Sequence, residues 1–374
     1  MQIARVETFR VNYAVRGHFK FFEQPDGKPP CRPTVVVKLT ADGGTVGWGQ
    51  CVPSPRWSYE SVETCETTIR HYLAPILIGA DPFAIDAIHA EMNRSIAPSF
   101  STGQPIAKAG IDLALHDLVG RTTNQPTTLR LSPERNKQSE ARPIALSWSI
   151  NVRLLDDVGP EIEQANHRGY ASFNVKVGPD LALDLELCRL VKHLAPSAVV
   201  WADANGGYDE ESAAAAAKDL AKLGFAAIEQ PLPANRLGGY QRLVQQRALP
   251  IVMDEGIVSC VELEEFHRLG LLDGVAMKVA RCGGLTEAGR IMEFARNEGL
   301  MILGSGLTDP DLSLAASLIL FSAYDLQIPT ALNGPQYLTT SILRKPLVVE
   351  NGAIAPPSDP GLGVEVDEAA LLSA

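Results

Sequence analysis

Five ionisable residues close successive short apolar segments in the middle of the chain. In chain order they are Lys176 after SFNV, Asp203 after AVVWA, Glu229 after FAAI, Asp254 after LPIVM and Lys278 after GVAM. They are 27, 26, 25 and 24 residues apart, the length of one strand–helix unit. In a closed (β/α) barrel the carboxyl ends of successive strands share one rim, where barrel enzymes place their chemistry. We therefore expect the five side chains to converge at that rim.

The three carboxylates Asp203, Glu229 and Asp254 predict a metal site. Neighbouring carboxylates in a cleft cannot all stay ionised without a cation. Asp and Glu also cap helices in many folds, but three in register are not easily explained as caps. Because the matching positions offer oxygen donors and no His or Cys, the pattern favours Mg²⁺ over Zn²⁺.

Lys176 and Lys278 lie one strand before and one strand after these carboxylates. A lysine at a strand end usually extends its ammonium group into solvent. Two lysines that bracket a carboxylate triad instead predict general bases, whose pKa depends on desolvation and nearby charges. We expect both to be catalytic.

The elements that position these residues alternate between strand and helix from about residue 142 onward. Eight apolar strand candidates are separated by helical stretches such as DEESAAAAAKDLAKLG: PIALSWSI, SFNVKVG, AVVWADANGG, FAAIEQP, LPIVMDEG, GVAMKVARCGG, LMILGSG and LQIPTALNG. This alternation predicts βαβ units and a parallel sheet. Eight strands favour a closed barrel. A doubly wound sheet is the alternative, but the sequence lacks the glycine-rich phosphate-binding motif that follows an early strand in that fold.

The two ends of the chain follow other patterns. The first 50 residues alternate apolar and polar residues, a pattern that predicts a three-stranded antiparallel sheet. Residues 16–33 interrupt this pattern and contain Gly and Pro, so we expect a loop there that is either a surface loop or a substrate lid. A helical stretch is expected over about 59–120. After residue 333 the chain is rich in Pro and Gly, with one short strand candidate, GVEVD, and we expect this tail to pack on the N-terminal region.

Composition excludes several classes of protein. The chain is 45% hydrophobic and 21% charged, as in ordinary globular proteins, and 33 basic against 44 acidic residues give a net charge of −11. An acidic chain lacks the basic surface that nucleic acids and anionic membranes require. The sequence has no membrane-spanning apolar run, no apolar signal-peptide core at its start and six scattered cysteines without a C-x-x-C pair. We expect a cytoplasmic protein.

With three further stretches, the five residues resemble the enolase superfamily, in the muconate lactonizing enzyme subgroup of the mandelate racemase/muconate lactonizing enzyme family. The stretches are AGIDLALHDLVGR, VARCGGLTEA and PGLGVEVDEAAL. The resemblance implies a (β/α)7β TIM-like barrel over 140–334. It also implies an α+β capping domain over 1–130, on which 335–374 pack back.

The resemblance also implies chemistry for individual residues. Mg²⁺ would be bound by Asp203, Glu229 and Asp254, and the lysines at 176 and 278 would move protons. The shared step of the superfamily is abstraction of the proton α to a carboxylate, which gives an enediolate. A small-molecule carboxylate is thus the implied substrate, and a homo-oligomer the implied assembly.

Two positions depart from the subgroup. It usually carries Lys-x-Lys on the second strand, whereas this chain has Asn174-Val175-Lys176, so that position offers hydrogen bonds without charge. Dipeptide epimerases tend to carry Asp-x-Asp after the last strand, where it binds the substrate ammonium group, whereas this chain has the neutral Asn333. These differences favour an N-blocked or hydroxylated acid over a substrate with a free ammonium group.

Other residues are assigned supporting roles. Glu255 is expected beside the metal ligands, and Asn205 is expected to orient Asp203. Asp309 and Asp311 either face the substrate or cap the next helix, and His116 is expected to be a core residue. Candidate specificity residues in the two loops that reach over the barrel mouth in the family are Phe19, Phe22, Arg56 and Trp57.

The predicted activity is that of a Mg²⁺-dependent racemase or epimerase of a carboxylic acid, such as an N-substituted amino acid or a dipeptide. The same enediolate serves a cycloisomerase of the muconate lactonizing type or an acid dehydratase, so both remain as alternatives. A third hypothesis is a binding protein without catalytic activity. The presence of all five ionisable residues argues against it.

Overall fold

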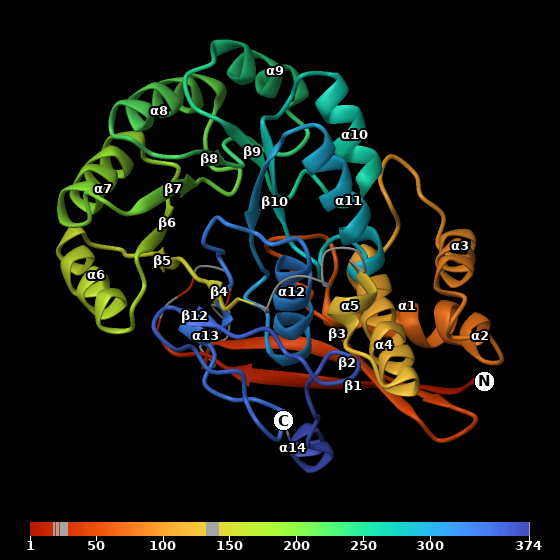
Figure 1. Ribbon diagram of the computed structural model, residues 1–374. Coiled ribbons are helices and arrows are strands. Elements are labelled where there is room, and N and C mark those ends of the chain that lie inside the picture. The colour runs from red at the N-terminus through yellow and green to blue at the C-terminus, as the bar shows by residue number, and fades with distance from the viewer. Residues whose placement is uncertain (18, 20–21, 23–28, 132–141, 374) are drawn as a thin grey trace.

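A curved parallel sheet surrounded by helices forms one part of the molecule, and an antiparallel sheet with its own helices lies beside it (Figure 1). The computed structural model describes residues 1–17, 19, 22, 29–131 and 142–373.

The parallel sheet has the strand order β11-β10-β9-β8-β7-β6-β5. Its strands are β5 (Trp148–Ile150), β6 (Ser172–Lys176), β7 (Val199–Asp203), β8 (Ile228–Glu229), β9 (Ile251–Met253), β10 (Gly274–Met277) and β11 (Met301–Gly304). Parallel bridges from Leu146 to Thr330 and from Ser305 to Ala331 join the two edges, which closes the barrel. The expected eighth strand is limited to these two bridges because Pro329, just before them, has no N–H for a ladder.

Helices on the outside of the barrel connect consecutive strands (Figure 1). They are α6 (Val158–His167), preceded by a 3₁₀ turn (Leu155–Asp157), α7 (Leu181–Leu194), α8 (Glu210–Lys222), α9 (Leu237–Gln246), α10 (Cys260–Arg268), α11 (Leu285–Asn297) and α12 (Asp311–Ala323). In α8 the buried residues Ala213, Ala216, Ala217 and Leu220 recur at helical spacing, and Asp209 caps the first turn by accepting from the Ser212 N–H. This spacing explains why the helix lies flat against the sheet.

Inside the barrel, a buried cluster separates the strand ends that carry the ionisable residues from the opposite end. It comprises Trp201, Ala227, Val252, Ala276, Leu303 and Ala331. Small side chains on neighbouring strands leave room for the single large indole of Trp201, which is fully buried. The barrel is therefore a packed core rather than a channel.

The N-terminal region contains the expected antiparallel sheet of β1 (Ile3–Ala14), β2 (Cys31–Ala41) and β3 (Val46–Cys51). The expected helical stretch is divided into several pieces. Helix α1 (Val62–Thr68), a π-helical turn (Ile69–Leu73) and α2 (Ala74–Leu77) follow one another directly, and non-helical residues separate them from α3 (Ile85–Ser95) and α3 from α4 (Pro105–Thr123). The short helix α5 (Thr127–Leu131) follows beyond the expected stretch. Helix α4 is buried along most of its length because it packs against β3. A Cβ at Gly49 would lie 2.0 Å from the Gly110 carbonyl oxygen, so only glycine permits this approach.

The C-terminal residues run back along both parts of the molecule. Strand β12 (Ala353–Ile354) pairs with β4 (Ile144–Ala145), and the short helices α13 (Gly334–Tyr337) and α14 (Glu368–Ser373) flank the tail. The Leu362 N–H donates to Asp117 of α4, and the Lys38 ammonium of β2 pairs with Glu368 at 2.8 Å. GVEVD contributes a single bridge, Leu343 to Val366, rather than a strand. None of the helices in the described ranges has the length and apolar character to cross a membrane.

Candidate active site at the barrel mouth

The five ionisable residues lie at the carboxyl ends of five consecutive barrel strands. Lys176, Asp203 and Glu229 are the last residues of β6, β7 and β8, while Asp254 and Lys278 directly follow β9 and β10. Lys176 pairs in register with Asp203, and Asp203 with Glu229. The structure therefore brings the five together, and side-chain contacts link them further.

The carboxylates of Asp203, Glu229 and Asp254 form a buried triad whose ligand oxygens lie within 4.8 Å of one another. Each carboxylate has one oxygen held by a fixed donor of the protein. The Asn205 N–H donates to Oδ1 of Asp203 at 2.9 Å, and the Trp201 Nε1–H donates to Oε2 of Glu229 at 2.9 Å. Arg281 donates to Oδ1 of Asp254.

The donor set of the triad fits a hard divalent cation. Oε1 of Glu229 is buried and has no hydrogen-bond partner among the described residues. Burial, reinforced by the charges of Asp203 and Asp254, raises the pKa of Glu229 well above its ordinary value. A cation would relieve this repulsion, and three carboxylate oxygens are ligands that suit Mg²⁺.

The two lysines contact the outer members of the triad. Lys176 pairs with Oδ2 of Asp203, and Lys278 with Oδ2 of Asp254. Burial lowers the pKa of Lys176, but the charges of Asp203 and Glu229 outweigh it, so the net pKa lies above the ordinary value. With the carboxylates uncompensated, Lys176 is therefore held as an ammonium ion.

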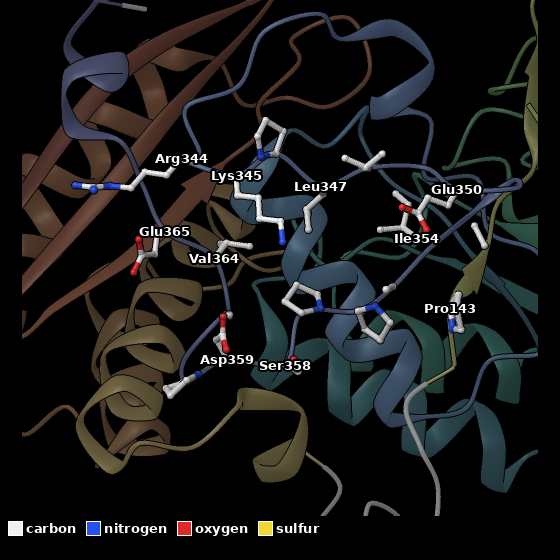
Figure 2. A pocket seen from close by; sticks show the side chains of 18 of the residues that line it. Pro143, Arg344, Lys345, Leu347, Glu350, Ile354, Ser358, Asp359, Val364 and Glu365 are labelled. Carbon is white, nitrogen blue, oxygen red and sulfur yellow. The ribbon is translucent and has the colours of Figure 1, made fainter.

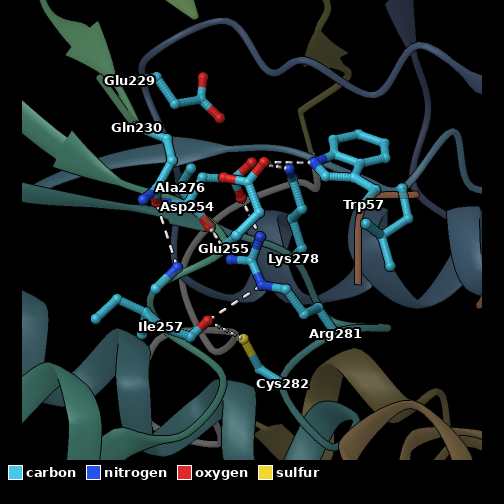
Figure 3. Close-up of polar contacts among 12 residues, drawn as sticks. Trp57, Glu229, Gln230, Asp254, Glu255, Ile257, Ala276, Lys278, Arg281 and Cys282 are labelled. Atoms are coloured by element: carbon cyan, nitrogen blue, oxygen red, sulfur yellow. Dashed lines mark hydrogen bonds and ion pairs between the residues drawn. The ribbon is translucent and has the colours of Figure 1, made fainter. Parts of the chain in front are cut away.

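Trp57, from the loop after β3, covers both lysines. Its ring centroid lies 4.2 Å from Nζ of Lys278 and 5.7 Å from Nζ of Lys176, within the range of cation–π attraction. The indole Nε1–H donates to Glu255 at 2.8 Å (Figure 3). The N-terminal region thus supplies one wall of the site.

Glu255 links Trp57 to the triad region. Its Oε1 accepts from Trp57 and, at 3.2 Å, from the Asn205 side chain. Burial, together with the adjacent charge of Asp254, raises the pKa of Glu255 to about 7. Asn205 therefore contacts both Asp203, through its backbone, and Glu255, through its amide.

Asn174 and Asn333 contribute uncharged groups to the interior of the barrel. Asn174 pairs in register with Trp201 and is buried, and neither polar atom of its side chain has a hydrogen-bond partner within the described ranges. The Asn333 amide donates to Ser149 at 3.4 Å, while its Oδ1 has no partner in the same part of the chain. These amides retain unused donors and acceptors.

The aromatic residues of the first loop lie against Trp57. Phe19 is buried, with ring centroids 5.0 Å from Phe22, 6.4 Å from Trp57 and 4.9 Å from Tyr337. Arg56, by contrast, is exposed. Within the expected lid over 16–33, residues 18, 20–21 and 23–28 lie outside the described residues.

The remaining candidates are engaged in internal contacts. Asp309 is buried, accepts from the Leu307 N–H and the Ser317 hydroxyl, and has a pKa that burial raises. Asp311 accepts from the Ser341 hydroxyl and the Ile342 N–H and so holds the start of the tail. His116 is buried in α4 with its Nε2 3.0 Å from the Thr286 hydroxyl.

Three polar residues at the site were not identified from the sequence. Trp201 contacts Glu229. Arg281 contacts Asp254, and Gln230 accepts from the Asp254 N–H at 2.7 Å (Figure 3). Burial alone would raise the pKa of Asp254, but Arg281 and Lys278 lower it to about 2. The position of Arg281, three residues after Lys278, is a sequence signal that could have identified it.

A large cavity lies elsewhere. It has a volume of about 1040 Å³ and is lined mainly by tail residues, among them Arg344, Lys345, Asp359 and Glu365 (Figure 2). None of the five strand-end residues lines it. We therefore place the chemistry at the barrel mouth, where the triad and the lysines meet.

Family models cover most of the chain. Residues 30–129 match the mandelate racemase/muconate lactonizing enzyme N-terminal domain, and residues 157–370 match the enolase C-terminal domain-like family. A chloromuconate cycloisomerase of Cupriavidus necator is 31% identical over 339 residues, covering 89% of each chain. The N-succinyl-L-Arg/Lys racemase of Bacillus cereus is 27% identical over 375 residues, covering 99% of this chain and 97% of its own.

Solved structures show the same relationship. The N-succinyl Arg/Lys racemase of Bacillus cereus superposes with a TM-score of 0.90 at 25% identity, covering 100% of this chain and 98% of its own. Muconate lactonizing enzyme of Pseudomonas fluorescens, complexed with muconolactone, gives 0.89 at 26% identity with the same coverage. Sequence, fold and the triad at the barrel mouth agree: the chain belongs to the mandelate racemase/muconate lactonizing enzyme family and is an enzyme of the enolase superfamily.

Proposed function

We propose that the chain is a Mg²⁺-dependent racemase or epimerase that removes and returns the proton α to a substrate carboxylate. The observation that carries the proposal is the placement of Lys176 and Lys278, which contact opposite members of the triad, Asp203 and Asp254. Inversion at one carbon needs a base on one face and an acid on the other. The racemase of Bacillus cereus, which matches nearly the whole chain, supports the same reaction class.

The proton transfers are assigned to the two lysines. The neutral Nζ of one lysine takes the α-proton as the C–H bond breaks, and the electron pair moves into the carboxylate to form an enediolate. The ammonium group of the other lysine then donates a proton to the opposite face, so the two lysines exchange protonation states. A divalent cation held by Asp203, Glu229 and Asp254 would offset the charge of the enediolate and of the triad, whose attraction keeps Lys176 protonated.

The uncharged amides support an N-blocked or hydroxylated acid as the substrate. Asn174 lies two residues before Lys176 on the same strand and therefore on the same interior face. Together with Asn333 it offers hydrogen bonds without a formal charge. A substrate ammonium group would gain little there, whereas an amide or a hydroxyl group would find both donors and acceptors.

Cycloisomerisation is the second candidate, because the chloromuconate cycloisomerase of Cupriavidus necator is 31% identical to the chain. Opening or closing a lactone proceeds through the same enediolate but needs one lysine rather than two. The reaction types therefore differ in how many lysines they require.

The test follows the α-proton in D2O. Carboxylic acids, including N-acyl amino acids, hydroxy acids and muconate, are incubated with Mg²⁺ and the parent, Lys176→Ala or Lys278→Ala, and deuterium uptake and stereochemistry are measured. Each alanine variant is expected to lose inversion yet retain slow exchange of the proton facing the remaining lysine. Lys222→Ala, at an exposed lysine of α8, is the control.

Two outcomes contradict the proposal. If either variant inverts the centre at near the parental rate, a one-lysine reaction such as cycloisomerisation is the better account. If the parent binds Mg²⁺ yet exchanges no α-proton of any acid that binds, the chain is a binding protein on this scaffold.

A further inference from the structure

Arg281 lies beside the triad but outside the set of ligands and bases. It occupies the turn after β10, three residues after Lys278, and its side chain is 2% exposed. A guanidinium group is costly to bury unless its donors are paired. The contacts of the guanidinium group therefore indicate the role of this side chain.

Each nitrogen of the guanidinium group has a partner. Nε donates to the Ile257 carbonyl at 3.1 Å, one terminal nitrogen donates to the Ala276 carbonyl at 2.8 Å, and the other donates to Oδ1 of Asp254 (Figure 3). Ile257 follows β9 and Ala276 lies within β10, so the planar group spans two strand–helix units. Because two of the guanidinium nitrogens are bound to backbone carbonyls, the third nitrogen is held in a fixed position against Asp254.

This contact restricts the Asp254 carboxylate. The backbone N–H of Asp254 is held by Gln230 at 2.7 Å, and Arg281 holds Oδ1, which leaves Oδ2 as the oxygen that contacts Lys278. Rotation of the carboxylate would break the bond to Arg281. The contact with Arg281 therefore fixes the plane of the Asp254 carboxylate.

We propose that Arg281 is a positioning residue: it holds Oδ1 of Asp254 so that Oδ2 is presented to the metal in the narrow geometry that Mg²⁺ requires. The inference rests on the metal site of the proposed function and adds a determinant of its selectivity. Mg²⁺ demands near-ideal octahedral geometry, whereas Ca²⁺ accepts longer and more variable contacts. Loss of the constraint should therefore affect the two ions differently.

A purely electrostatic role makes the opposite prediction. Removing a positive charge beside a carboxylate strengthens its attraction for any cation, so Mg²⁺ and Ca²⁺ would both bind more tightly. A purely structural role would lower stability without changing the ratio of the two affinities.

The experiment measures Mg²⁺ and Ca²⁺ dissociation constants by calorimetry on metal-stripped protein. Arg281→Met is expected to weaken Mg²⁺ binding at least tenfold and Ca²⁺ binding less than threefold. Arg281→Lys keeps the positive charge but replaces the planar guanidinium group with a single ammonium group, which cannot hold all three partners at once. The preference for Mg²⁺ over Ca²⁺ should therefore fall in this variant too. If Arg281→Met does not fold, the lysine variant carries the test.

Arg32→Met is the matched control. Arg32 is also buried, but its guanidinium group donates to the carbonyls of Leu307 and Val52 rather than to a triad member. We expect it to lower the melting temperature while leaving the Mg²⁺ to Ca²⁺ ratio unchanged.

An unchanged ratio in the folded Arg281 variants, or tighter Mg²⁺ binding in Arg281→Met, would overturn the inference. A parent that exchanges no α-proton while Arg281→Lys shows the lowered ratio would contradict the proposed reaction and leave this inference standing. A parent that binds no divalent cation would overturn both.

Discussion

Glu229 differs from the two aspartates of the triad in the partners of its oxygens. Asp203 and Asp254 each face a lysine, whereas Oε1 of Glu229 has no partner among the residues described. A buried carboxylate oxygen without a donor is costly, and a metal ion compensates that cost directly. Glu229 is therefore the residue at which metal binding should be most sensitive to charge.

Glu229→Gln is expected to weaken Mg²⁺ binding at least tenfold, about 1.4 kcal/mol or more, because it removes a charge from a hard-cation site. Calorimetry on metal-stripped protein measures the change. Glu262→Gln is the control, since Glu262 is also buried but accepts from the Ser101 and Ser259 hydroxyls, away from the triad. Equal Mg²⁺ affinities for Glu229→Gln and the parent would refute the ligand assignment.

At the scale of elements, the loop that carries Trp57 continues into Glu60, which anchors the start of α4. The buried carboxylate accepts from the Ile106 N–H at 2.7 Å and from the Ala107 N–H at 2.9 Å. Burial outweighs these bonds and the nearby Lys108 charge, and raises the pKa of Glu60 to about 7. The folded protein thus binds this proton more tightly than the unfolded chain does.

The pH dependence of stability follows from that difference. The contribution of Glu60 is fully present below its unfolded pKa, near 4.5, and is lost as the pH rises through about 7. The stability of the parent relative to Glu60→Gln should therefore fall by roughly 3 kcal/mol between pH 4.5 and pH 8. Urea unfolding at both values measures it, with Glu186→Gln on α7 as an exposed control. A difference that stays constant with pH would show that Glu60 ionises normally.

The sequence predicts the strand ends well because they depend on a local, repeated pattern. Five short apolar segments at nearly constant spacing place their last residues on one rim whatever the details of the loops. Arg281 and Gln230 were not predicted from the sequence, because their roles depend on how individual turns fold back on Asp254. The Trp57–Glu255 contact joins residues 198 positions apart, and no local pattern encodes such a distance.

At the scale of the whole molecule, helix α4 and the loop after β3 join the antiparallel region to the barrel. Asp112 of α4 accepts from the Thr286 N–H at 3.2 Å at the start of α11. A Cβ at Gly284 would lie 2.2 Å from this carboxylate, so glycine is needed for the close approach. The same docking brings Trp57 over the lysines. The barrel supplies the ionisable groups, and the antiparallel region supplies the surface that excludes water from them.

Trp57 is the residue through which this division can be tested. Trp57→Phe removes the hydrogen bond to Glu255 but keeps a ring near both lysines, so we expect a loss of about tenfold in kcat/KM. Trp57→Ala also removes the ring, and losing a charge-assisted hydrogen bond and a desolvated cation–π contact together should cost roughly a hundredfold or more. Mg²⁺ affinity should stay within about threefold of the parent in both variants, because the indole N–H of Trp57 donates to Glu255, which is not a member of the triad. Steady-state kinetics on an acid that the parent turns over, combined with calorimetry, separates these effects. If the alanine variant retains parental kcat/KM, the antiparallel region does not shape the reacting centre. If it loses Mg²⁺ binding instead, the indole acts on the metal site rather than on the lysines.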